Sequence, residues 1–132
     1  MAEIKPNYDT KRKKLSEIIP LAHPFTVYIE QTKYCNFKCF YCIHSTRDEA
    51  DGEFRALGHR MQHMDFEFYK KIIKELQEFP RGGIKRIVFS GLGEPLMNPR
   101  LPELVRMAVD AKIADRVEII TNGLLLTPEK SS

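Results

Sequence analysis

A fourth cysteine is missing from this sequence. The 132-residue chain has three, and all of them lie within the eight residues CNFKCFYC at 35–42. An odd number of thiols cannot all pair as disulfides. The amino end, MAEIKPNYDTKRKKLSEII, contains no apolar stretch long enough for a signal peptide, so we expect a cytoplasmic protein. Thiols stay reduced in that compartment, which makes metal ligation the leading interpretation.

Long hydrophobic runs and a strong excess of one charge are also missing. No apolar segment approaches the ~20 residues that a membrane-spanning helix needs, so we expect no membrane partner. The 21 lysines and arginines nearly balance the 18 acidic residues, leaving a net charge of +3. Much of the excess is the run KRKK at 11–14, which has no interleaved aromatic residues and fits a solvated helix face better than a nucleic-acid site.

What is present is a regular alternation of strand and helix patterns. Residues 9–19 predict a short basic helix within an N-terminal extension, residues 1–24. Residues 43–64 have no regular period and predict a long loop or a broken helix. Between and after these lie a strand in FTVYIEQT, a helix capped by Asp65, a strand in IKRIVFSG, a helix capped by Asn98 and opened by Pro99, and a strand and turn in RVEIITNG.

This order is a βαβαβ pattern, which predicts an α/β fold with a parallel sheet and helices on one or both of its faces. The last residues, LLLTPEKSS, resemble the start of a further helix. We therefore expect residues 25–132 to be one incomplete domain.

The three cysteines have the spacing C-x3-C-x2-C and directly follow the first expected strand. A loop at the carboxyl end of a parallel strand can wrap Cys35, Cys39 and Cys42 around one centre. Soft thiolates suit zinc or an iron–sulfur cluster. A structural Cys3His zinc site would take its fourth ligand from a histidine, either His44 or one of His59 and His63, whereas a cluster would keep one iron open. A third alternative is an electron carrier, in which the protein would hold all four irons of a cluster. The absence of a fourth cysteine from the sequence argues against it.

Two further motifs are expected at the same edge of the sheet. SGLGEP, residues 90–95, follows the second strand, and TNG, residues 121–123, follows the third. Glycines there let the backbone approach a ligand closely, Glu94 offers a carboxylate to an ammonium group, and Pro95 fixes the turn. Each motif alone is an ordinary turn, but parallel strands bring both beside the cysteine loop.

Together, CNFKCFYC, GLGEP and TNG after successive strands resemble the N-terminal part of the radical S-adenosylmethionine (SAM) enzyme core. The resemblance implies that the three cysteines ligate a 4Fe-4S cluster whose fourth iron is left for S-adenosylmethionine. It assigns no catalytic residue. The SAM contacts that it implies are Tyr41 at the adenine and Gly91, Gly93, Glu94 and Pro95 around the methionyl amino end, with Thr121 and Asn122 on the substrate side.

The resemblance also implies a fold, a reaction and partners. The fold is the N-terminal βαβαβ portion of a partial (β/α)6 TIM-like barrel, here apparently truncated. The reaction is reductive cleavage of S-adenosylmethionine to a 5′-deoxyadenosyl radical, with an electron donor such as flavodoxin or ferredoxin. The motifs are more similar to members that build cofactors or modify peptides, often with a second cysteine-rich domain, than to RNA-modifying members. A small-molecule or peptide substrate is therefore favoured over RNA.

Overall fold

The computed structural model of this protein describes residues 14–46, 60–80 and 83–128. None of the helices in these ranges is long and apolar enough to cross a membrane. The elements follow in the order η1 (Leu15–Glu17), β1 (Thr26–Ile29), η2 (Ile43–Thr46), α2 (Phe66–Leu76), β2 (Ile84–Phe89), η3 (Pro95–Met97), α3 (Leu101–Asp110) and β3 (Ala114–Ile119), where η marks a 3-10 helix.

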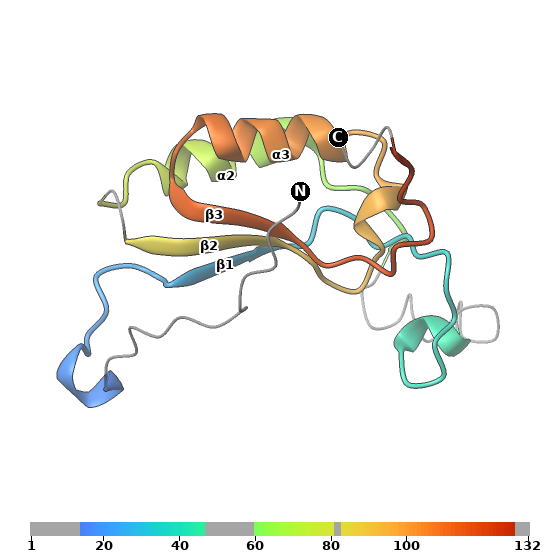
Figure 1. Ribbon diagram of the computed structural model, residues 1–132, viewed down its shortest axis with the longest axis horizontal. Helices are drawn as coiled ribbons and strands as arrows, with labels where there is room; N and C mark the ends of the chain where they lie inside the picture. The colour runs from blue at the N-terminus through green and yellow to red at the C-terminus, as the bar shows by residue number, and fades with distance from the viewer. Residues whose placement is uncertain (1–13, 47–59, 81–82, 129–132) are drawn as a thin grey trace.

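The three strands form one parallel sheet in the order β1-β2-β3. In the register of the sheet, Ile29 lies beside Phe89, and Phe89 lies beside Ile119. Helices α2 and α3 both cover the same face of this sheet, as Figure 1 shows. This confirms the predicted α/β class and βαβαβ order, and it brings the carboxyl ends of all three strands to one edge.

The core lies between the sheet and the two helices. Ile87 and Phe89 of the central strand are fully buried, as the continuous apolar run of β2 predicted. Tyr69 of α2 is also fully buried, and its hydroxyl donates to the Leu104 carbonyl of α3 over 2.6 Å. Burial raises the pKa of Tyr69, because the phenolate would lose its hydration inside the core. This hydrogen bond joins the two helices above the sheet.

Two expected helix positions need correction. The helix expected to begin at Pro99 begins at Leu101, because the Asn98 side chain accepts from the Arg100 amide and forms a turn before the helix. Asn98 also donates to the Gln31 carbonyl over 3.0 Å, which ties this turn to the end of β1. Of the helix expected over 9–19, the described part contains only the 3-10 turn η1, and residues 9–13 lie outside the described residues.

The segment before α2 is more ordered at its end than its sequence predicted. Residues 47–59 lie outside the described residues, but Thr32 and His63 form an antiparallel bridge. The Lys33 amide donates to the Gln62 carbonyl, and the Met64 amide donates to the Gln31 carbonyl, each over 3.0 Å. The chain between β1 and the cysteines is therefore held from both sides, by this segment and by Asn98.

Candidate functional site

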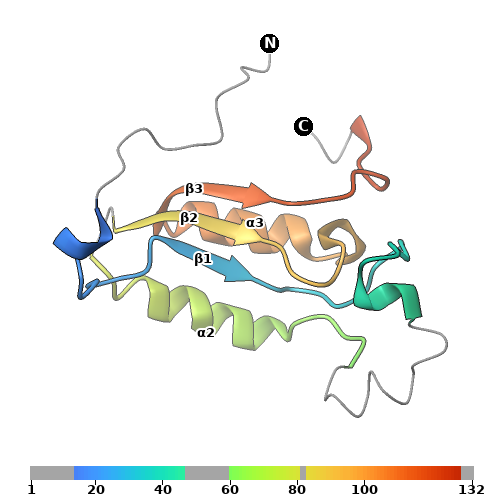
Figure 2. The ribbon, with the colours of Figure 1, turned by 90° about the horizontal axis from the view of Figure 1, so that it is seen from below.

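The cysteine loop leaves the sheet at the carboxyl end of β1, beyond the arrowhead in Figure 2. Cys35, Cys39 and Cys42 form no disulfide and are half-buried. The Cys42 amide donates to the Cys39 carbonyl over 2.9 Å, so a turn separates these two residues, and η2 follows directly. Among the described residues, no three side chains of His, Cys, Asp or Glu are gathered closely enough to hold a metal ion. The donor set itself, three soft thiols in one short loop, fits an iron–sulfur cluster.

The aromatic residues between the cysteines face outward. The side chain of Phe40 is 89% exposed and that of Tyr41 is 79% exposed, and their rings meet edge to face at 5.1 Å. The Cys39 sulfur lies beside the Tyr41 hydroxyl and raises the pKa of Tyr41, because a thiolate there would repel the phenolate. Tyr41 therefore presents an open ring face next to the middle cysteine, as a residue that seats a flat heterocycle requires.

The GLGEP loop after β2 lies directly against the start of the cysteine loop. A Cβ at Gly93 would collide with the Thr32 carbonyl and would lie 2.8 Å from the Tyr34 carbonyl. The next amide, that of Glu94, donates to the Tyr34 carbonyl over 2.8 Å. Glycine at 93 is thus required by the close approach of two backbones. The contact fixes the distance between this loop and Cys35.

The Glu94 carboxylate is buried and already engaged by the protein. One oxygen, Oε1, accepts from the Thr121 hydroxyl at 2.5 Å and from the Leu96 amide at 2.9 Å. The other, Oε2, accepts from the Asn122 amide at 2.7 Å. The side chain is only 3% exposed. In this structure Glu94 therefore joins the GLGEP loop to the TNG loop, in addition to the cofactor contact that its sequence motif predicts.

The TNG loop is tied to the cysteine loop as well. The Asn122 side chain donates to the Asn36 side chain over 2.8 Å, one residue after Cys35. Gly123 adopts a φ of 77°, a conformation that glycine tolerates best. Pro95 is buried and opens η3 immediately after Glu94. The structure thus brings the three sequence motifs together at one edge of the sheet.

Two residues that the sequence did not connect with the GLGEP loop support it. Glu30, just past β1, accepts from the Leu92 amide at 2.6 Å through Oε1. His44, two residues after Cys42, has its Nε2 3.0 Å from the Leu92 carbonyl and is almost fully buried. The only sequence signals for them were their positions, Glu30 directly after the first strand and His44 two residues after Cys42.

The histidine contacts bear on the zinc alternative. His44 directs Nε2 at a backbone carbonyl, and His63 lies against the Tyr34 ring with 4.8 Å between ring centres. His59 lies outside the described residues. In this structure the Nε2 of His44 therefore contacts Leu92 rather than the cysteine loop.

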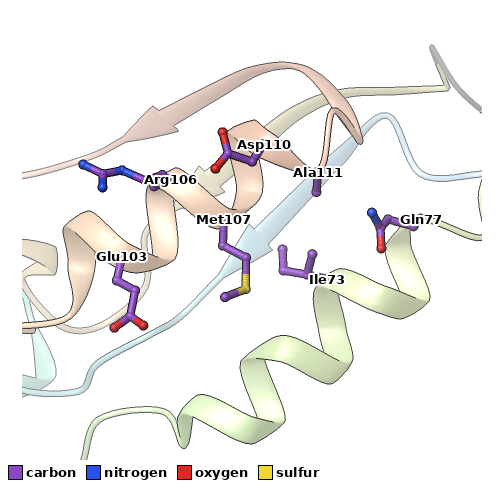
Figure 3. Close-up of a pocket in the computed structure, with 7 residues that line it drawn as sticks. All are labelled: Ile73, Gln77, Glu103, Arg106, Met107, Asp110 and Ala111. Atoms are coloured by element: carbon purple, nitrogen blue, oxygen red, sulfur yellow. The ribbon is translucent and has the colours of Figure 1, made fainter.

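A groove lies elsewhere, between α2 and α3 (Figure 3). Its walls are Ile73, Gln77, Glu103, Arg106, Met107, Asp110 and Ala111. None of the residues in the three motifs lines it. The candidate site is therefore the edge formed by the loops, and the helix groove is separate from it.

The comparison with protein families agrees with the three motifs. The model of the family described as the radical SAM superfamily matches residues 29–131, which include all of them. The chain belongs to the radical SAM superfamily. The match begins at the last residue of β1 and includes Glu30 and His44.

Two curated relatives show which branches of the superfamily are similar. A tungsten-containing aldehyde ferredoxin oxidoreductase cofactor-modifying protein from Pyrococcus furiosus is 33% identical over 103 residues, 78% of this chain and 25% of the relative. A probable GTP 3′,8-cyclase from Methanococcus maripaludis is 38% identical over 95 residues, 72% of this chain and 27% of the relative. The chain thus spans about a quarter of the length of these relatives.

A solved structure matches the fold of this radical SAM chain. The crystal structure of BtrN in complex with AdoMet and 2-DOIA superposes with a TM-score of 0.63 and 29% identity, covering 80% of this chain and 39% of that one. The radical SAM assignment therefore rests on the sequence motifs, the family model and the backbone together.

Proposed function

We propose that this chain provides the cluster-binding and SAM-binding part of a radical SAM enzyme. The observation that carries the proposal is the joining of three loops. The C-x3-C-x2-C loop, GLGEP and TNG follow successive parallel strands and are linked through Tyr34, Glu94, Asn36 and Asn122. In this proposal residues 25–132 form the N-terminal part of the core domain, and residues 1–24 are an extension.

Each motif then has a defined task. Cys35, Cys39 and Cys42 hold three irons of a 4Fe-4S cluster and leave the fourth open, since no fourth cysteine exists. The backbone of Gly91 and Gly93 and the carboxylate of Glu94 receive the amino end of S-adenosylmethionine, and Pro95 shapes this turn. The exposed ring of Tyr41 seats the adenine, and Thr121 and Asn122 lie toward the substrate.

When bound, the cluster and S-adenosylmethionine supply a one-electron cleavage that gives methionine and a 5′-deoxyadenosyl radical, which takes hydrogen from a substrate. The protein's own contribution is position. Glu94 and the Gly93 contact fix the glycine loop relative to Cys35, and a loop held by the protein's own contacts lowers the ordering cost of binding.

We further propose a cytoplasmic enzyme that receives its electron from a donor such as flavodoxin or ferredoxin. The cysteine loop must stay reduced to load iron, which the cytoplasm permits. A small molecule is the favoured substrate class, because the names of the two curated relatives refer to cofactor modification and to GTP. A peptide substrate is the next candidate and RNA the third.

The experiment that tests the cluster is anaerobic loading of the chain with iron and sulfide, followed by chemical analysis of both. We expect about four irons and four sulfides per chain, as a 4Fe-4S cluster requires. Cys39→Ala should lose most of this iron, while Phe40→Ala in the same loop should keep it, because the Phe40 side chain is exposed and is no ligand.

Two results would contradict the ligand assignment. One is a full cluster in Cys39→Ala. The other is a wild-type chain that takes up no iron but binds one zinc tightly, which would favour the Cys3His zinc module instead.

A further inference from the structure

The peptide groups on both sides of Leu92 are held by side chains from outside the GLGEP loop. The Leu92 amide donates to Glu30 Oε1 over 2.6 Å, and the Leu92 carbonyl lies 3.0 Å from His44 Nε2. A carbonyl can only accept, so the His44 ring carries its proton on Nε2 in this contact. Leu92 lies between the two glycines that the proposed function assigns to S-adenosylmethionine.

The two side chains come from two different parts of the site. Glu30 follows β1, while His44 belongs to η2, directly after the third cysteine. His44 is 1% exposed, so its bond to Leu92 is shielded from competing water. Each side chain reaches Leu92 across more than forty residues of sequence, so neither contact is a local turn.

The space around Gly91 belongs to the same arrangement. A Cβ at Gly91 would lie 2.6 Å from both Cγ and Oε1 of Glu30. Glycine at 91 therefore leaves room for the Glu30 carboxylate to reach the Leu92 amide. With Gly93 pressed against Thr32, the backbone from 91 to 93 is fixed on both sides.

We propose that Glu30 and His44 are positioning residues that hold the Gly91–Gly93 backbone in the conformation that binds S-adenosylmethionine. This inference rests on the proposed function. Because His44 follows the third cysteine so closely, it also sets the position of the glycine loop relative to the end of the cysteine loop. Neither residue needs to touch the cofactor or an iron.

The test compares alanine with glutamine at each position. Glu30→Gln keeps an oxygen that can accept from the Leu92 amide, and His44→Gln places an amide nitrogen near the position of Nε2. Glu30→Ala and His44→Ala remove the contacts. Glu75→Ala, an exposed residue of α2, is the matched control for loss of a carboxylate.

Three quantities are measured on each chain: iron per chain, hydrogen exchange of the Leu92 amide without ligand, and the dissociation constant for S-adenosylmethionine. We expect both alanine variants to keep the iron of the wild type. Glu30→Ala should speed exchange of the Leu92 amide, and both should weaken S-adenosylmethionine binding about tenfold or more. The glutamine variants should recover most of the affinity, and Glu75→Ala should match the wild type in all three.

Unchanged affinity in both alanine variants would overturn the inference. So would a loss of iron that parallels the loss of affinity, because the residues would then act on the cysteine loop. A wild-type chain that holds a cluster but does not bind S-adenosylmethionine would overturn the proposed function and the inference with it. The exchange measurement separates these cases, since it reports the Glu30 contact without cofactor.

Discussion

At the scale of single residues, the site depends on the absence of a Cβ atom at Gly93. The Thr32 carbonyl fills the space in which a Cβ would lie, and the Tyr34 carbonyl is 2.8 Å from it. These are backbone atoms, which cannot rotate out of the way as a side chain can. The two loops can therefore touch only while this position has no side chain.

Replacing Gly93 with alanine should push the glycine loop away from the cysteine loop. We expect a loss of about 1–3 kcal/mol in the free energy of unfolding, the usual cost of overpacking, together with lower iron loading. Urea unfolding and iron analysis measure the two effects. Gly123→Ala is the control: its Cβ would meet open space, so only the φ of 77° penalises it and iron loading should not change. Equal iron loading in Gly93→Ala and the wild type would contradict this account.

Glu94 shows why the site could be only partly predicted from sequence at this scale. The motif indicated a carboxylate at the carboxyl edge of the sheet, and the Glu94 carboxylate lies there, hydrogen-bonded to the loop after β3. Its partners Thr121 and Asn122 lie on another loop, and the direction of a side chain in a loop follows no period. The contacts of Glu30 and His44 with Leu92 were not predicted for the same reason.

At the scale of elements, the strands and helices followed their sequence patterns closely where burial was continuous. β2 is buried on both sides near its end, and its apolar run predicted it. Asp65 caps α2 as expected, accepting from the Phe68 amide at 2.8 Å. The predicted start of α3 was wrong by two residues, because the Asn98 side chain hydrogen-bonds to the Arg100 amide in a turn and to the Gln31 carbonyl. Residues 62–64 pair with residues 31–33, just after β1, without any alternation that would predict it.

The hydrogen bond between Tyr69 of α2 and Leu104 of α3 predicts in which direction the free energy of unfolding changes with pH. Burial raises the pKa of Tyr69 in the folded chain, so on raising the pH the unfolded chain loses the phenol proton first. Stability from this group is complete below about pH 10, the ordinary tyrosine value, and is lost as the pH rises above it. The loss is up to about 1.4 kcal/mol for each pH unit above that value.

The measurement is urea unfolding of the wild type and Tyr69→Phe at several pH values from 8 to about 11. Below pH 9 the variant should be less stable by about 1 kcal/mol, because it lacks the hydrogen bond to Leu104. Above pH 10 this difference should shrink or reverse. A difference that stays constant across the range would show that Tyr69 ionises as easily in the folded chain as in the unfolded one.

At the scale of the whole molecule, the fold presents three loops at one edge and two helices on one face (Figures 1 and 2). The parallel order of the strands, which the βαβαβ pattern predicted, brings together motif residues that are 27 to 86 positions apart in the sequence. The chain spans about a quarter of the length of the curated relatives described above.

The central claim, that three thiolates leave one iron open for S-adenosylmethionine, is tested most directly by electron paramagnetic resonance. The chain is loaded anaerobically with iron and sulfide, reduced, and its spectrum is recorded with and without S-adenosylmethionine. We predict the signal of a reduced 4Fe-4S cluster whose g values shift when the compound is added. A cluster signal that is identical in the two spectra would contradict the claim.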